Sequence, residues 1–126
     1  MQKILVIDDD LLLLNAIQFL LDNKGYKTIT IPTTEDVFAT IEQERPDLIL
    51  LDVYLAGEDG RDFCLTLKSE PLSKDIPVVI LSGDYRVEED IHQYGANDFL
   101  LKPFQINNLF KMIERNIANN LKAHKK

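Results

Sequence analysis

Three carboxylates, a hydroxyl and an ammonium group each follow a short apolar run in this chain. The runs are 4–7, before Asp8 and Asp9; 48–51, before Asp52; 77–81, before Ser82; and 99–101, before Lys102. Three clustered carboxylates repel one another unless a cation lies among them, and oxygen ligands of this kind suit Mg²⁺. A lysine and a hydroxyl beside that ion would form a receptor for a phosphoryl group. These residue types therefore predict phosphoryl chemistry, provided that the fold brings them together.

The apolar runs predict how the fold does this. Runs of three to five apolar residues without alternation are typical of parallel strands that are buried on both faces. The carboxyl ends of parallel strands share one edge of the sheet, and open α/β sheets bind their ligands outside that edge. Asp52 is the best candidate nucleophile, because it stands alone at the end of a central strand. Asp8 and Asp9 form a pair suited to holding the metal.

The segments between the strands predict helices, which gives an alternating βαβ pattern. A further strand is expected at 26–31, and Asp10 has the residue type of a helix N-cap. We therefore predict an α/β fold: a doubly wound, five-stranded parallel sheet of order 2-1-3-4-5, flavodoxin-like, with five helices. Four helices are expected over 10–23, 60–69, 86–94 and 105–121. A fifth is expected from the capping segment 33–36 through Ile41.

Length and composition limit the possible classes of protein. With 126 residues, of which 45% are hydrophobic, the chain fits one domain over 1–121, and 122–126 is expected to be a basic tail or the start of a linker. The net charge of −7 argues against direct binding of nucleic acid or of an anionic membrane. No apolar stretch approaches the ~20 residues of a spanning helix, so we expect a cytoplasmic protein. The single cysteine, Cys64, excludes an internal disulfide.

Four motifs resemble the receiver domain of bacterial two-component response regulators, including the chemotaxis regulators. They are the acidic motif 4–10, the phosphoacceptor strand 46–52, the strand with a switch hydroxyl at 79–83, and the last strand with its lysine-proline turn at 95–104. The resemblance extends from Lys3 to about Leu121. It implies a signalling domain that phosphorylates and dephosphorylates itself and is not an enzyme in the usual sense.

The resemblance also implies a role for each residue of the acidic pocket. Asp52 would accept a phosphoryl group from phosphohistidine on a sensor histidine kinase or a histidine phosphotransfer protein. Asp8 and Asp9, with Asp52 and the backbone carbonyl of Tyr54, would hold Mg²⁺. Lys102 would bind the phosphoryl oxygens. The output would pass to an unidentified partner or to a fused output domain.

A switch is the second implication of the resemblance. Ser82 would move toward the phosphoryl group, and Phe99 would turn inward into the space that Ser82 leaves; a static core aromatic is the alternative for Phe99. The Lys102–Pro103 peptide would be cis. The stretch 82–95 is about two residues shorter than the family pattern, so the fourth helix is expected to be short or displaced.

Other classes of protein share parts of this pattern. A haloacid-dehalogenase-like phosphatase would use Asp8 as the nucleophile within the Asp8-x-Asp10 pair, although the chain has no room for a cap domain. A flavodoxin-like electron carrier would need a first loop that cradles a phosphate, which three acidic residues would repel. A receiver that binds partners without phosphorylation is the third alternative.

Overall fold

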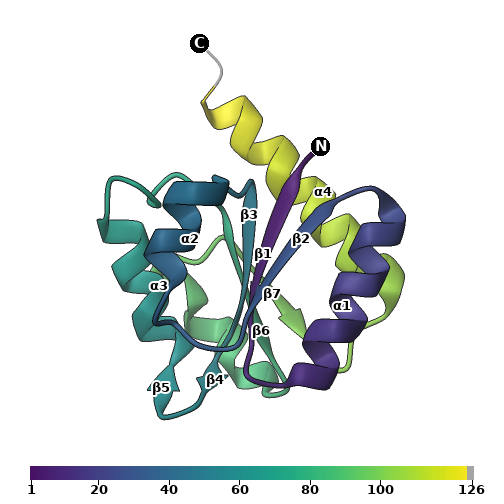
Figure 1. Cartoon of the computed structure of the whole chain (residues 1–126). Coiled ribbons are helices and arrows are strands. Elements are labelled where there is room, and N and C mark those ends of the chain that lie inside the picture. Colours follow the sequence, from purple (N-terminus) through teal and green to yellow (C-terminus); the bar gives the residue numbers. More distant parts are fainter. Residues whose placement is uncertain (125–126) are drawn as a thin grey trace.

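The computed structural model describes residues 1–124 and contains a five-stranded parallel sheet (Figure 1). The strand order is β2-β1-β3-β6-β7, so the predicted order 2-1-3-4-5 of the main strands is confirmed. The strands are β1 (Lys3–Ile7), β2 (Lys27–Ile31), β3 (Leu48–Asp52), β6 (Val78–Ser82) and β7 (Asp98–Leu101).

Helices cover both faces of the sheet. In Figure 1, α1 and α4 lie on one side of the sheet and α2 and α3 on the other. Asp10 is the N-cap of α1, as predicted, and its carboxylate accepts hydrogen bonds from the backbone N–H groups of Leu12 and Leu13. The helices are α1 (Leu11–Lys24), α2 (Val37–Glu44), α3 (Gly60–Ser69) and α4 (Ile106–Ala123), with a 3₁₀ helix, η1 (Tyr85–Tyr94).

Two local features go beyond the sequence predictions. The fourth helix forms at the expected place but is a 3₁₀ helix over all of Tyr85–Tyr94. The loop after Asp52 contains a small antiparallel hairpin of β4 (Tyr54–Leu55) and β5 (Glu58–Asp59). Strands of two residues are too short to be recognised in a sequence. Gly57 turns this hairpin at a φ of 78°, a conformation that glycine adopts without steric cost.

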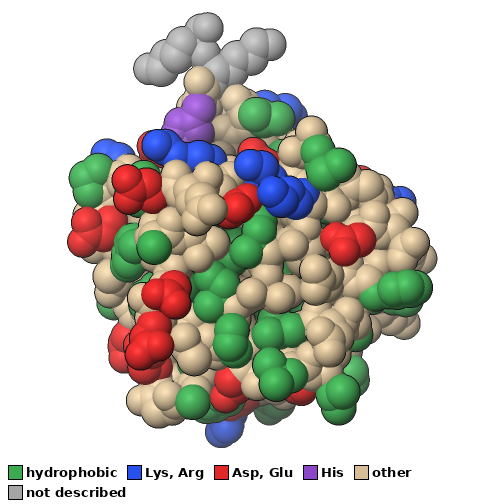
Figure 2. Space-filling view, in the orientation of Figure 1, with side chains coloured by type: hydrophobic (Ala, Val, Ile, Leu, Met, Phe, Trp, Pro, Cys, Tyr) green, Lys and Arg blue, Asp and Glu red, His purple; other side chains and the backbone are tan. Residues whose placement is uncertain are grey.

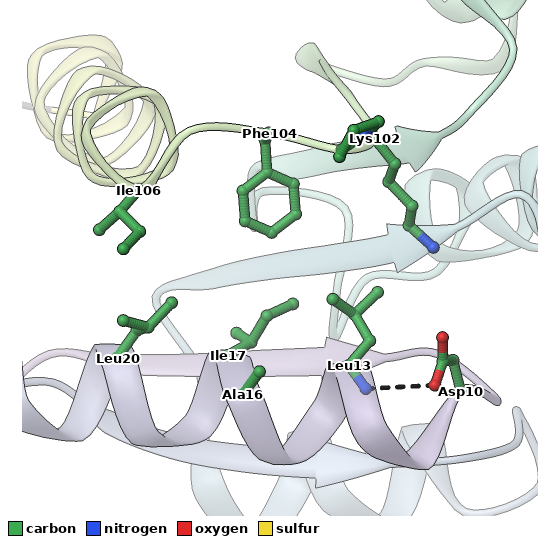
Figure 3. Close-up of a pocket in the computed structure, with 9 residues that line it drawn as sticks. Asp10, Leu13, Ala16, Ile17, Leu20, Lys102, Phe104 and Ile106 are labelled. Carbon is green, nitrogen blue, oxygen red and sulfur yellow. Dashed lines mark hydrogen bonds between the residues drawn. The ribbon is translucent and has the colours of Figure 1, made fainter.

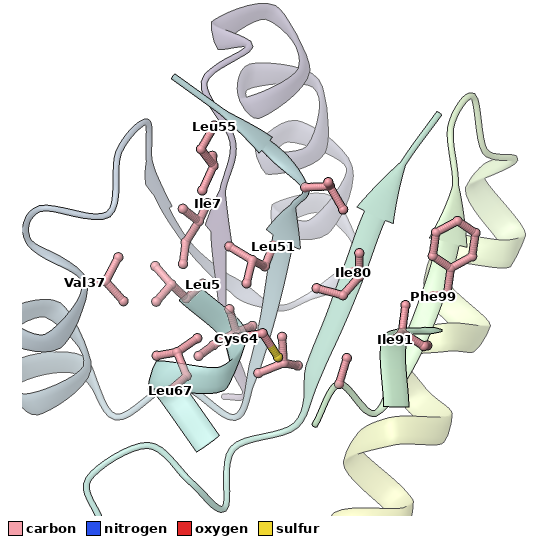
Figure 4. Close-up of a cluster of buried hydrophobic side chains, with 14 of the residues drawn as sticks. Leu5, Ile7, Val37, Leu51, Leu55, Cys64, Leu67, Ile80, Ile91 and Phe99 are labelled. Atoms are coloured by element: carbon pink, nitrogen blue, oxygen red, sulfur yellow. The ribbon is translucent and has the colours of Figure 1, made fainter. Parts of the chain in front are cut away.

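The hydrophobic core consists of two clusters, one on each face of the sheet. Successive side chains of a strand point to opposite faces, so Leu5, Ile7 and Leu51 pack against α2 and α3, as Figure 4 shows, together with Ile91 of η1. Alternate strand residues pack against α1 and α4 on the other face. The central strands are therefore buried on both faces, as their uninterrupted apolar runs predict.

The surface and the chain end complete the fold. Figure 2 shows acidic side chains on the side of the molecule where α2 and α3 lie. Of the predicted tail 122–126, Lys122 and Ala123 belong to α4, whereas 125–126 lie outside the described residues. Within 1–124, no helix has the length and apolar character needed to cross a membrane.

Candidate functional site

The ends of β1, β3 and β7 bring Asp8, Asp52 and Lys102 together. The Nζ atom of Lys102 donates hydrogen bonds to Oδ2 of Asp8 at 2.9 Å and to Oδ1 of Asp52 at 3.1 Å. The Asp8 and Asp52 side chains are only 1% and 7% exposed, whereas that of Lys102 is 23% exposed. Residues that are 94 and 50 positions apart in the chain thus meet at the carboxyl edge of the sheet.

Asp9 completes a carboxylate cluster that fits a hard divalent cation. Asp8, Asp9 and Asp52 each offer one oxygen, and these three oxygens lie within 4.8 Å of one another. Oδ1 of Asp8 also accepts a hydrogen bond from the backbone N–H of Asp10 at 2.9 Å, which fixes its orientation. A set of oxygen donors with one exposed member suits Mg²⁺, because this ion retains several waters. Tyr54 begins β4 two residues beyond Asp52, with an exposed ring.

The electrostatics of the cluster show that one ammonium group does not balance it. Burial raises the pKa of Asp52 above its usual range, Lys102 opposes this shift, and the charge of Asp8 adds to it. Burial lowers the pKa of Lys102, but hydrogen bonds and charge from Asp8 and Asp52 outweigh that effect and raise it overall. Lys102 is therefore protonated, while burial still disfavours the ionised form of Asp52. An additional positive charge would offset this effect.

Ser82 lies at the same edge of the sheet. Leu81 is paired in register with Asp52, and Ser82 follows it at the end of β6. The backbone N–H of Lys102 donates to the carbonyl of Ser82 at 2.8 Å, and the buried Ser82 Oγ accepts a hydrogen bond from the N–H of Asp84 at 3.0 Å. The hydroxyl is thus held at the end of the strand next to Asp52, where the sequence predicts it.

Phe99 lies in β7, directly beside Ile80, and its ring is buried in the cluster drawn in Figure 4. The ring therefore already occupies the core in this conformation, and its role in a switch remains a prediction. The Lys102–Pro103 peptide is cis, as expected from the resemblance.

Gly60 is a site residue that sequence reasoning did not identify. A Cβ atom on Gly60 would lie 1.9 Å from the carbonyl oxygen of Asp52, so only glycine fits there. Its N–H donates to the carbonyl of Val53 at 2.7 Å, which fixes the start of α3 against the strand that ends in Asp52. The only signal in the sequence is a glycine at the start of a predicted helix, which does not reveal what approaches it.

An apolar groove opens beside the acidic cluster. Its volume is about 410 Å³. Figure 3 shows Leu13, Ile17 and Leu20 of α1 on one side and Phe104 and Ile106 on the other. Asp10 and Lys102 lie at one end of the groove. A partner that reaches Asp52 from this side would meet an apolar surface.

Fold and site together define a doubly wound α/β protein with an acidic pocket at the carboxyl edge of its sheet. The family model for the response regulator receiver domain matches residues 4–114, and the chain belongs to this family. The DNA-binding response regulator MtrA of Mycobacterium tuberculosis is 30% identical over 121 residues, covering 94% of this chain and 52% of the relative. The chain thus spans about half the length of the curated relatives it matches.

Solved structures agree with this assignment. A response regulator from Chloroflexus aurantiacus has a TM-score of 0.86 at 29% identity, covering 93% of this chain and 98% of the other. The receiver domain of the sensor histidine kinase PA1611 from Pseudomonas aeruginosa has a TM-score of 0.83 at 26% identity, covering 93% and 98%. The latter holds a magnesium ion in its active site cleft.

Proposed function

We propose that this chain accepts a phosphoryl group on Asp52 from phosphohistidine of a sensor histidine kinase or a histidine phosphotransfer protein. The observation that carries the proposal is the Lys102 ammonium, which bridges Asp8 and Asp52 at 2.9 and 3.1 Å. A carboxylate nucleophile with a cation and an acidic pair beside it has the parts that phosphoryl transfer requires. The magnesium ion in the related PA1611 domain supports the same function for the cluster here.

In the transfer step, an Asp52 oxygen attacks phosphorus while the bond from phosphorus to the histidine nitrogen breaks. The electron pair of that bond stays on the imidazole, and an acyl phosphate forms on Asp52. The Lys102 ammonium exchanges its contact with the Asp52 carboxylate for one with a phosphoryl oxygen. Mg²⁺, when held by Asp8, Asp9, Asp52 and the Tyr54 carbonyl, would supply further positive charge to the phosphoryl oxygens.

The output requires that phosphorylation favour one of two arrangements of the domain. Ser82 would move to donate its hydroxyl to the phosphoryl group, and Phe99 would repack beside it. Both residues lie at the β6–β7 side of the sheet, next to η1. The altered surface would then bind a partner or a fused output domain. The apolar groove beside Lys102 would contact the protein that delivers the phosphoryl group, because that protein must reach Asp52.

The phosphatase alternative is disfavoured by the position of Asp10. A nucleophilic Asp8 would need the second acid of the Asp8-x-Asp10 pair for proton transfer. Here the Asp10 carboxylate instead accepts hydrogen bonds from the N–H groups of Leu12 and Leu13, as the cap of α1. Asp8 itself has both oxygens engaged, one with the Asp10 N–H and one with Lys102.

Incubation with a small phosphodonor and Mg²⁺ tests the proposed function. The wild-type chain is expected to gain the mass of one phosphoryl group, whereas Asp52→Asn gains none because the nucleophilic carboxylate is missing. Intact-mass spectrometry measures both. Equal uptake by the two proteins would exclude Asp52 as the acceptor.

Tyr54 is expected to prolong the phosphorylated state. Hydrolysis needs a water molecule in line with the leaving carboxylate oxygen. Tyr54 lies only two residues after Asp52 and has an exposed ring, which would screen the approach of that water. The Asp84 carboxylate, by contrast, is held by Arg86 through two bonds of 2.9 Å. Tyr54→Ala should shorten the lifetime severalfold, and Asp84→Ala should change it less. Phosphate loss after removal of the donor measures this, and an unchanged or longer lifetime in Tyr54→Ala contradicts it.

A further inference from the structure

We propose that Arg61 is a latch that holds η1 in its 3₁₀ form, and that release of this latch accompanies activation of the receiver. The inference rests on the proposed function of Asp52 and concerns its regulation. The Arg61 latch consists of Arg61 and Asp59 at the start of α3 and of Asp90 and Tyr94 in η1. It joins the hairpin that follows Asp52 to the segment that follows Ser82.

The guanidinium group of Arg61 contacts two carboxylates and a ring. Its Nη2 and Nε donate to Asp59 at 2.8 and 3.1 Å, and its Nη1 donates to Asp90 at 3.2 Å. The guanidinium carbon lies 5.4 Å from the centre of the Tyr94 ring. The Arg61 side chain is only 23% exposed, so solvent screens these contacts less than those of a free surface arginine. Arg61 thereby ties the start of α3 to the second half of η1.

The backbone of η1 conflicts with its own sequence pattern. Its buried residues Val87 and Ile91 are four positions apart, as are Asp90 and Tyr94, and this is the spacing of one face of an α-helix. Runs of 3₁₀ helix longer than three or four residues are uncommon, yet η1 has ten. We therefore take an α-helix as the alternative form of η1.

The 3₁₀ form makes η1 longer than an α-helix of the same sequence. A 3₁₀ helix rises ~2.0 Å per residue and an α-helix ~1.5 Å, so the ten residues of η1 extend roughly 5 Å farther as 3₁₀. Rewinding to an α-helix would shift Asp90 and Tyr94 relative to Arg61 and open the latch.

Both ends of the proposed switch connect to the latch. Gly60 packs against the backbone of Asp52, and Arg61 is the next residue. At the other end, the N–H of Asp84 donates to Ser82 Oγ, and Asp84 caps η1. Movement of Ser82 toward a phosphorylated Asp52 would therefore change the start of η1 while α3 holds Asp90 and Tyr94. Asp52, through Gly60, and Ser82, through Asp84, would thus both act on the latch.

Hydrogen exchange of residues 85–94 in the unphosphorylated full chain tests the latch. Arg61→Met keeps the aliphatic stem and removes the guanidinium, and we expect about tenfold faster exchange of η1 amides, equivalent to ~1.4 kcal/mol. Asp90→Ala should act similarly, and the double variant should add little because both changes remove the same contact. Unchanged exchange in both single variants would overturn the proposal.

Arg86→Met is the matched control. Arg86 also pairs with a carboxylate, Asp84, but both residues lie at the start of the same segment and bridge no two elements. Its variant should change η1 exchange less than twofold, and an effect equal to that of Arg61→Met would contradict the latch.

The rate of phosphorylation separates a latch from a purely structural contact. If Arg61 holds the resting form, Arg61→Met populates the active form more and should take up phosphoryl groups from a small donor severalfold faster. A slower or unchanged rate would contradict the regulatory role. Should wild-type Asp52 accept no phosphoryl group, the proposed function fails by itself, whereas the exchange measurement still decides whether Arg61 restrains η1.

Discussion

Lys102→Met is expected to slow phosphoryl uptake from a small donor by about 10²- to 10³-fold, the effect typical of removing one preorganised group that stabilises transition-state charge. Lys102 is the only cation that contacts the carboxylate cluster among the described residues, and it touches both Asp8 and Asp52. Methionine has a similar volume without the charge, so the loss reports on electrostatics rather than packing. Rates of phosphorylation at saturating Mg²⁺ measure it.

Lys27→Met provides the control for this prediction. Lys27, on the edge strand β2, pairs with Glu44 of α2, and the Lys27 side chain is half exposed. The same substitution there should leave the rate unchanged. A Lys102→Met rate within threefold of the wild type would show that Lys102 does not bind the transferring group.

Mg²⁺ is expected to stabilise the folded chain through the same cluster. A ligand that binds only the folded state adds RT ln(1 + [L]/Kd), about 2.7 kcal/mol at roughly 100 times Kd. This gain corresponds to a rise of several degrees in the melting temperature of a domain of this size. Asp9→Ala should abolish the shift, because Asp9 supplies one of the three clustered oxygens. Thermal melts with and without millimolar Mg²⁺ measure both proteins.

Asp10→Ala is the matched control, since Asp10 is adjacent in sequence but caps α1 outside the carboxylate cluster. Loss of the cap should cost about 1 kcal/mol and leave the Mg²⁺ shift intact. A melting temperature indifferent to Mg²⁺, or a shift that persists in Asp9→Ala, would argue against a metal site at the cluster.

Asp52→Asn should stabilise the metal-free protein at neutral pH. The folded pKa of Asp52 lies above its ordinary 3.8, so between these two values the folded state binds more protons and stability falls as pH rises. The ionised carboxylate therefore destabilises the fold at all higher pH, and asparagine removes this penalty. The stability difference should vanish below the ordinary pKa of aspartate.

The sheet and the edge that carries the site follow directly from the sequence. Uninterrupted apolar runs such as 48–51 have no polar face to turn to solvent, so they predict strands with helices on both sides. Once the strands are parallel, the residues after them must share one edge, which places Asp52 near Lys102 without knowledge of any contact. Asp10 was equally predictable, because helix capping depends on residues two and three positions away.

The features that sequence reasoning missed depend on contacts between distant elements. Val87 and Ile91 are four positions apart, the spacing of one face of an α-helix, so this pattern does not predict the observed 3₁₀ form. The tight approach of Gly60 to the Asp52 carbonyl and the reach of Arg61 to Asp90 likewise arise from how α3 packs. No local pattern records these tertiary distances.

The position of the phosphoryl group on the chain tests the proposed function most directly. After reaction with a small phosphodonor and Mg²⁺, reduction with borohydride converts an aspartyl phosphate to homoserine, and fragment mass spectrometry locates the altered residue. We expect the modification at Asp52 alone, with none in protein treated without the donor. Modification at Asp8, or at no aspartate, would contradict the function proposed here.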